Sequence, residues 1–161
     1  MIPPEKDGIV IAAVSPSVDD AVRLMRELDD ELRGRYPGFT PHGLEAWELT
    51  DPRLVFLVAR AGGRAIACAA MREIEPRVGE VKRMFVEDEW RGRGVARQIL
   101  AAIESTARER GYAMLRIETG RRQPEAIKLY RSAGYADIPV FGDYVGNPMS
   151  VCFEKRLSVV R

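Results

Sequence analysis

The chain has 161 residues, of which 46% are hydrophobic and 30% are charged, with 25 Lys and Arg against 24 Asp and Glu. This length and balance are typical of one globular domain, so residues 1–161 are expected to form a single domain. The net charge is +1, and no apolar run approaches the roughly 20 residues of a membrane helix. These features exclude a general attraction to nucleic acid or to a membrane.

Cysteine and histidine content bears on metal binding and on the compartment. Cys68 and Cys152 lie far apart in apolar runs, and His42 is the only histidine. Structural zinc sites need closely spaced Cys and His ligands, so we expect no metal centre and two reduced core thiols. Residues 1–7 contain no apolar signal core, and a cytoplasmic protein is expected.

The first third of the chain predicts a buried strand over Ile9–Val14 and then a long helix. The helix has an apolar stripe on one side. The stripe consists of Val22, Met25, Leu28 and Leu32. Pro and Gly break helices, so the helix should end near Tyr36–Gly38. A short helix is expected over Leu44–Leu49.

Two strands, Leu54–Ala59 and Ala65–Met71, flank Gly62 and Gly63 and predict a β-hairpin. After a second turn, the next strand covers Glu80–Val86. Alternation along a strand predicts that its even-numbered side chains share one face. These side chains are Glu80, Lys82, Met84 and Val86.

The second half of the chain alternates helices with strands. One helix ends at Gly111, a strand covers Ala113–Glu118, and a further helix runs from Pro124 to Gly134. The last strands are expected at Tyr135–Ile138 and Ser150–Arg156. This order predicts an α/β (α+β) fold, with a mixed central sheet of about six to seven strands and helices on both faces.

The segment Arg91–Ala96 (RGRGVA) opens a helix directly after a strand and a short loop. Amides at a helix start have no partner within the helix and lie at the positive end of its dipole, so they bind phosphate oxygens well. Gly92 and Gly94 allow an anion to approach the backbone. Neighbouring arginines add positive charge, namely Arg91, Arg93 and Arg97. A pyrophosphate is the expected ligand.

Several anion-binding motifs compete for this segment. A P-loop requires GxxxxGK[ST], which is absent, and a dinucleotide fingerprint requires a third glycine where Arg97 stands. An ordinary glycine-containing turn before a helix is a further alternative. The segment matches all six positions of [QR]xxGx[GA], the coenzyme A loop of the GNAT N-acetyltransferase superfamily.

A second motif strengthens this resemblance. Residues 123–135 (QPEAIKLYRSAGY) are similar to the GNAT segment NxxAxxxYxxxGF, with Gln123 in place of Asn and Tyr135 in place of Phe. The two motifs follow in the family's order with one strand between them. The chain therefore resembles the GNAT superfamily over roughly Leu54–Tyr135.

The resemblance implies acetyl-coenzyme A (acetyl-CoA) as cosubstrate and no metal. It implies that the parallel strands Glu80–Val86 and Ala113–Glu118 are adjacent and splay after Val86, which leaves a cleft for the pantetheine arm. It places Arg97 near phosphate and Gln123 near the cofactor arm. The backbone contacts fall in two groups: Met84, Phe85 and Val86 for pantetheine, and Arg91, Gly92, Arg93, Gly94, Val95 and Ala96 for pyrophosphate.

The resemblance also implies two catalytic candidates. An amine with a pKa of about 10 must lose a proton, and the departing thiolate benefits from a proton donor. Tyr130 matches the tyrosine that often lies near the cofactor sulfur, although a core tyrosine is the alternative. Glu80, eleven positions before Arg91, matches a general base found in some members. The alternative is a strand-end Glu paired with Lys82 or an Arg.

The acceptor site of the family is lined by the first helix, its following loop and the last hairpin. These correspond to Asp29–His42 and Pro139–Ser150. The candidate pocket residues are Tyr36, Phe39, His42, Phe141, Asp143 and Tyr144, and Asp143 or Glu31 could attract an ammonium group.

We expect an N-acetyltransferase that acts on the primary amine of a small molecule. Acetylation of protein N-termini or lysines is the alternative activity, and a non-catalytic acyl-CoA sensor is the alternative class. A sensor needs Arg91–Ala96 but could dispense with Tyr130 and Glu80. A homodimer is compatible with the sequence.

Overall fold

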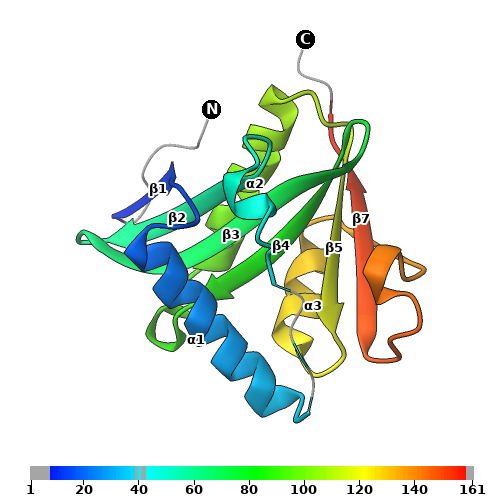
Figure 1. The fold of residues 1–161 in the computed structure, drawn as a ribbon, viewed down its shortest axis with the longest axis horizontal. Helices are drawn as coiled ribbons and strands as arrows, with labels where there is room; N and C mark the ends of the chain where they lie inside the picture. Colours follow the sequence, from blue (N-terminus) through cyan, green and yellow to red (C-terminus); the bar gives the residue numbers. More distant parts are fainter. Residues whose placement is uncertain (1–7, 39, 41–42, 159–161) are drawn as a thin grey trace.

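The computed structural model describes residues 8–38, 40 and 43–158. Within these residues a seven-stranded sheet has the order β1-β2-β3-β4-β5-β7-β6 (Figure 1). The strands are β1 (Ile9–Ala13), β2 (Val55–Ala61), β3 (Arg64–Glu75), β4 (Val78–Val86), β5 (Met114–Gly120), β6 (Ala136–Ile138) and β7 (Ser150–Arg156). The helices are α1 (Asp19–Arg35), α2 (Val95–Glu109) and α3 (Pro124–Ser132), with 3-10 turns η1 (Glu48–Thr50), η2 (Asp88–Trp90) and η3 (Gly142–Tyr144). The predicted mixed α/β sheet is confirmed.

Helices cover both faces of the sheet, as predicted. Alternation along β2 directs Leu57 into a core with α2 and α3, and directs Phe56 and Val58 into a second core with α1. Figure 1 shows α1 crossing the front of the sheet and α2 lying behind the strands. Each face of the central strands is therefore buried, which explains their nearly continuous apolar sequence.

The predicted apolar stripe of α1 is partly wrong. The residues that α1 buries completely or almost completely are Ala21, Leu24 and Leu28, whereas Val22 is 40% exposed. Met25 and Leu32 lie at the margin of the same core. The buried face is therefore shifted by about one residue from the prediction, toward Ala21 and Leu24.

The predicted helix over residues 44–49 is only the single 3-10 turn η1. The Glu48 carboxylate accepts a hydrogen bond from the Glu45 amide at 2.7 Å, and it pairs with Arg72 at 2.8 Å. Glu48 is 1% exposed. The segment is therefore held by a buried polar side chain rather than by a helical apolar stripe.

A β-bulge interrupts β4. Cys68 of β3 lies opposite Phe85, and Ala70 lies opposite Lys82, so two residues of β4, Arg83 and Met84, face one residue of β3. Arg83 has a φ of 56°, which is uncommon for a residue other than glycine. An extra residue of this kind bends the strand and increases its twist.

The bulge makes the predicted shared face of β4 wrong. Val86 and Met84 pack with the α2 core, in which the β3 partner of Val86, Ala67, also lies. Lys82 is instead paired with Ala70, which belongs to the α1 core. The extra residue reverses the alternation after Lys82, so Glu80 and Lys82 face α1 and the later even positions face α2.

The parallel pair β4 and β5 is adjacent, as predicted, but it separates earlier than expected. Pairing runs from Val78 opposite Met114 to Val81 opposite Ile117 and ends there, rather than after Val86. The separation begins just before the bulge. The edge of β4 beyond Val81 therefore has no β5 partner, while β5 stays paired with β7 to its end.

Candidate functional site

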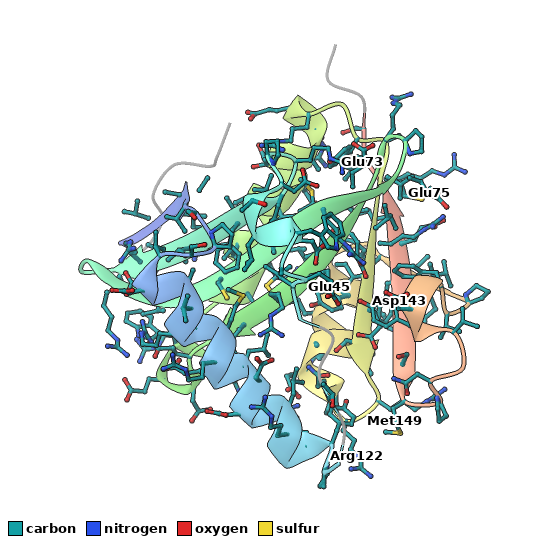
Figure 2. The ribbon with its side chains drawn as sticks, in the orientation of Figure 1. Glu45, Glu73, Glu75, Arg122, Asp143 and Met149 are labelled. Atoms are coloured by element: carbon teal, nitrogen blue, oxygen red, sulfur yellow. The ribbon has the colours of Figure 1, made fainter. Side chains whose placement is uncertain are left out.

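A cavity of about 280 Å³ lies where β4 and β5 separate. Its walls come from α1, the two separated strands, the β5–α3 connection, α3 and the segment before β7. The lining residues are Leu28, Leu32, Tyr36, Pro37, Val81, Lys82, Arg83, Met84, Glu118, Thr119, Gly120, Arg122, Gln123, Tyr130, Tyr144, Asn147 and Met149. Figure 2 shows Arg122 near the carboxyl end of α1.

The start of α2 has the features of an anion site. Gly92 and Gly94 have φ values of 73° and 80°, in the left-handed region that favours glycine. A Cβ atom at either position would meet nothing within 4 Å, so backbone conformation rather than crowding requires glycine here. The first turn of α2 contains no acidic residue. The exposed amides and the unpaired edge of β4 therefore fit a pyrophosphate and an amide-containing arm.

The Arg91 side chain links the loop at the start of α2 (Arg91–Ala96, here called the anion loop) to β4 and α1. Its Nε donates to the Val86 carbonyl at 2.9 Å, and its guanidinium pairs with Glu31 of α1 at 2.7 Å. The same guanidinium lies over the Phe85 ring, 5.6 Å from its centroid. Arg91 thus holds the anion loop in place and also adds positive charge to it.

The other two arginines lie on the surface around the helix start. Arg93 lies over the Trp90 ring at 4.8 Å, and Arg97 donates to the Ser132 hydroxyl at 2.6 Å, which links α2 to α3. Both side chains are exposed. Arg93 directly precedes the N-cap residue Gly94, and Arg97 lies in the first turn of α2.

Gln123 directly precedes α3 and lines the cavity. Its Oε1 accepts hydrogen bonds from the Gly120 amide at 3.1 Å and from the Tyr36 hydroxyl at 3.3 Å. The glutamine that replaces the family's Asn therefore closes the turn between β5 and α3.

The Tyr130 ring packs in the hydrophobic core, and the residue also lines the cavity. The residue is 4% exposed, and its ring lies 6.1 Å from that of Tyr135 and 5.8 Å from that of Phe153. Among the residues that the structure describes, no hydrogen bond to its hydroxyl is found. Burial, and then the nearby Glu118 carboxylate, raise the pKa of Tyr130, so the phenol stays protonated near neutral pH.

Glu80 lies inside β4 rather than at its start, and it is 1% exposed. One carboxylate oxygen accepts from Arg72 Nε at 2.9 Å, and the other accepts from the Tyr144 hydroxyl at 2.7 Å. Arg72 also bridges to Glu48. Glu80 is outside the set of cavity-lining residues, whereas Tyr144 belongs to it. The structure therefore places Glu80 behind Tyr144, with both carboxylate oxygens engaged.

Glu118 is a candidate that the sequence analysis overlooked. It lies in β5 directly after the last residue paired with β4, and it lines the cavity. Burial raises the pKa of Glu118 to about 7, although Ser150 Oγ donates to it at 2.6 Å. A carboxyl group with this pKa can both take up and release a proton near pH 7. The available signal is a glutamate near the end of the strand that precedes the Tyr130 helix, between Ile117 and Thr119.

The predicted acceptor residues are only partly brought together. Tyr36 and Tyr144 line the cavity, and Phe141 packs edge-on against Tyr144 at 5.4 Å. Asp143 is exposed on η3 (Figure 2), and Glu31 pairs with Arg91 away from the cavity lining. Phe39 and His42 lie outside the described residues.

Hydrogen bonds of Arg35, Tyr36 and Arg122, here called the polar clasp, join the end of α1 to the β5–α3 connection beside the cavity. The Tyr36 hydroxyl accepts a hydrogen bond from the Arg122 amide at 3.0 Å, and Arg35 and Arg122 each donate to the other's carbonyl at 3.0 and 2.8 Å. A Cβ atom on Gly120 would lie 1.8 Å from the Tyr36 hydroxyl. The end of α1 is therefore fixed to the β5–α3 connection, and this close approach requires glycine at position 120.

The two cysteines are unpaired and buried, as predicted. Burial raises the pKa of Cys68 to about 12 and that of Cys152 to about 11. Within the described ranges, no group of three His, Cys, Asp or Glu side chains could hold a metal ion. None of the helices in the described part of the chain is long and apolar enough to cross a membrane.

The sequence profile of the Acetyltransferase (GNAT) family matches residues 19–135. The chain therefore belongs to the GNAT family, as its two motifs predict, and it is an acyltransferase.

Individual relatives agree with this assignment. The chain is 42% identical to a protein of Azospirillum brasilense named IAA acetyltransferase, over 93% of this chain and 99% of that protein. A Klebsiella pneumoniae structure provisionally assigned as an acyl-CoA N-acyltransferase is 30% identical, with a TM-score of 0.79 over 93% of this chain and 98% of that chain. The same fold, at 18% identity and a TM-score of 0.71, occurs in a GNAT acetyltransferase from Elizabethkingia anophelis solved with acetyl-CoA bound, over 94% of this chain and all of that chain (100%).

Proposed function

We propose that this enzyme transfers an acetyl group from acetyl-CoA to the primary amine of a small molecule. The observation that supports this activity most strongly is the pair of side chains that share the cavity at the strand separation. Glu118 is a carboxyl group with a pKa of about 7, and Tyr130 is a phenol held in its protonated form. One group can accept a proton and the other can donate one.

The cosubstrate would be held by backbone groups. The amides of Arg91–Ala96 would bind the pyrophosphate, and the unpaired edge of Met84–Val86 would hydrogen-bond the pantetheine amides. Arg97 and Arg93 would add charge near the phosphates, and Gln123 would border the arm. When bound, acetyl-CoA supplies an acetyl group activated as a thioester.

The protein's own groups would handle the protons. The Glu118 carboxylate would take a proton from the acceptor ammonium, which frees the amine to attack the thioester carbonyl carbon. The C–N bond would form and the C–S bond would break, with the Tyr130 hydroxyl donating a proton to the departing sulfur. The second amine proton would return to the Tyr130 oxygen, and Glu118 would release its proton to water. We assign the base to Glu118 rather than to Glu80, because both oxygens of Glu80 are engaged by Arg72 and Tyr144. Glu80 would act by positioning the Tyr144 ring.

The clasp between α1 and the β5–α3 connection favours a small acceptor. An extended peptide needs an open groove, but Tyr36 and Arg122 join the two walls at one end of the cavity. Acetylation of peptide N-termini or lysines is the other outcome that the assay below can reveal.

Release of free thiol from acetyl-CoA, measured against a panel of small amines and peptides, tests the activity. Calorimetry tests the binding site: Gly94→Asp should abolish acetyl-CoA binding, because its carboxylate repels phosphate at the helix start. Gly63→Asp is the matched control, since Gly63 has a similar φ of 82° in the distant β2–β3 turn. Unchanged affinity in Gly94→Asp would refute the proposed site, and peptide turnover without small-amine turnover would replace the proposed acceptor class.

A further inference from the structure

Lys82 lies beside Glu118 where β4 and β5 separate. Val81 and Ile117 are the last paired residues of the two strands, so Lys82 and Glu118 are the next position on each. Both side chains line the cavity. Burial raises the pKa of Glu118, and the Lys82 cation lies near enough to its carboxyl group to lower that pKa in part, so the two groups share one wall of the cavity.

Lys82 is a partly buried cation with the carboxyl groups of Glu118 and Glu80 nearby, but it forms no salt bridge with either in the described part of the chain. Its Nζ donates to the Gly43 carbonyl at 3.0 Å. No ion pair within 4 Å joins it to a carboxylate among the described residues, although Arg83 beside it pairs with Asp29 at 2.9 Å. Burial, and then the neighbouring Arg72, lower the pKa of Lys82, so its charge is held at a cost. An ammonium group has three donors, and two remain for a ligand.

Resting on the proposed acetyl transfer, we propose that the acceptor is an amino acid or another amine with a carboxylate close by. Lys82 binds the carboxylate, and Glu118 receives the amine beside it.

The charge distribution of the cavity supports this class of acceptor. Among the lining residues in the described part of the chain, Glu118 is the only acidic side chain, whereas Lys82, Arg83 and Arg122 are basic. A monocationic amine adds positive charge to this surface, while a zwitterion adds none. A carboxylate on Lys82 also forms a charge-assisted hydrogen bond, which is roughly twice as strong as a neutral one.

Matched acceptor sets test the inference. Each set contains an amino acid, its amide and its decarboxylated amine, so that only the carboxylate differs. Wild-type enzyme should acetylate the preferred amino acid with a kcat/KM at least about tenfold above that for its two analogues, since a site built for a polar group rejects ligands that lack it.

Variants assign the preference to Lys82. Lys82→Met should remove the preference, mainly by raising KM for the amino acid, and Lys82→Arg should restore part of it. Lys128→Met, on the exposed side of α3, is the matched control and should keep the preference. Calorimetry should show that the N-acetyl amino acid product binds Lys82→Met about tenfold more weakly than wild type, because the product retains the carboxylate.

Equal use of the amide or the amine by the wild-type enzyme overturns the inference and leaves the acetyltransferase activity intact. An enzyme that binds acetyl-CoA and acetylates no amino acid also overturns it. Loss of acetyl-CoA binding at the α2 start would instead remove the proposed function itself. The comparison of an amino acid with its amide and amine on the wild-type enzyme tests the inference even if Lys82→Met fails to fold.

Discussion

Replacing Glu118 with Gln removes one negative charge from the cavity and changes little else. The Gln carbonyl can still accept the hydrogen bond that Ser150 Oγ donates at 2.6 Å. A general base typically contributes about 100- to 10,000-fold to a rate, so kcat/KM should fall within that range. The protein should at the same time become more stable above neutral pH, because the substitution removes a carboxylate that burial makes unfavourable.

The structure sets the size and the pH range of this gain. Burial moves the Glu118 pKa from its ordinary value of 4.5 to about 7. A change of this size corresponds to about 3 kcal/mol, and water in the open cavity reduces it to about 1–3 kcal/mol. Below pH 4.5 the carboxyl group is protonated in the folded and the unfolded chain, and the two proteins should differ little. As pH rises from 4.5 to about 7, the carboxyl group loses its proton in the unfolded chain but keeps it in the folded chain. The free energy of unfolding of the wild type therefore falls relative to that of Glu118→Gln. Above about pH 7 both states are ionised, and the difference in free energy of unfolding stays constant.

Urea unfolding at pH 4 and pH 8 measures the stability difference, and the pH profile of kcat/KM measures the base. The wild-type profile should rise through a pKa near 7, and Glu118→Gln should lack this limb. Glu89→Gln is the control for stability, because Glu89 is exposed on η2. A Glu118→Gln protein that is less stable than wild type at pH 8, or that keeps wild-type kcat/KM, would refute the reasoning.

Further substitutions test other parts of the site. Tyr130→Phe should lower kcat by about 100- to 10,000-fold with little change in melting temperature, since no partner for the hydroxyl is found among the described residues; near-wild-type turnover would make Tyr130 purely structural. Gly120→Ala should cost about 1–3 kcal/mol in urea unfolding, because its Cβ collides with the Tyr36 hydroxyl; an unchanged midpoint would contradict the clasp. Arg83→Gly should be more stable than Arg83→Ala, the reverse of the usual order in strands, because both lose the Asp29 pair while only Gly accepts the positive φ freely. Equal or reversed midpoints would argue against a strained bulge.

Local signals were sufficient for much of the fold. Pro124 at the first turn of α3 and Gly111 after α2 mark helix ends through their own backbone preferences, and both lie where predicted. The bounds of β7 also agree with the prediction. The glycines of the anion loop could be recognised for the same reason, since their left-handed conformation is a property of the residue type.

The candidate base depends on distant parts of the chain. Burial raises the Glu118 pKa, its hydrogen-bond donor Ser150 comes from β7, and no neighbour in sequence indicates either. Glu80 matched a family spacing, but its two hydrogen-bond partners come from β3 and from η3. Spacing identified the strand correctly and could not show which carboxyl group faces the cavity.

The bulge at Arg83 explains why the predicted shared face of β4 is wrong, because it adds one residue to the strand. It puts Lys82 and Met84 on opposite faces, so that the cation faces the α1 side and the apolar side chain joins the α2 core. It bends β4 next to Val81, where pairing with β5 ends and the cavity lies. An unbroken strand would keep Lys82, Met84 and Val86 on one face. Nothing in the residue type at position 83 indicates a positive φ, so the division between the proposed acceptor wall and the proposed cofactor edge depends on strand pairing across the sheet.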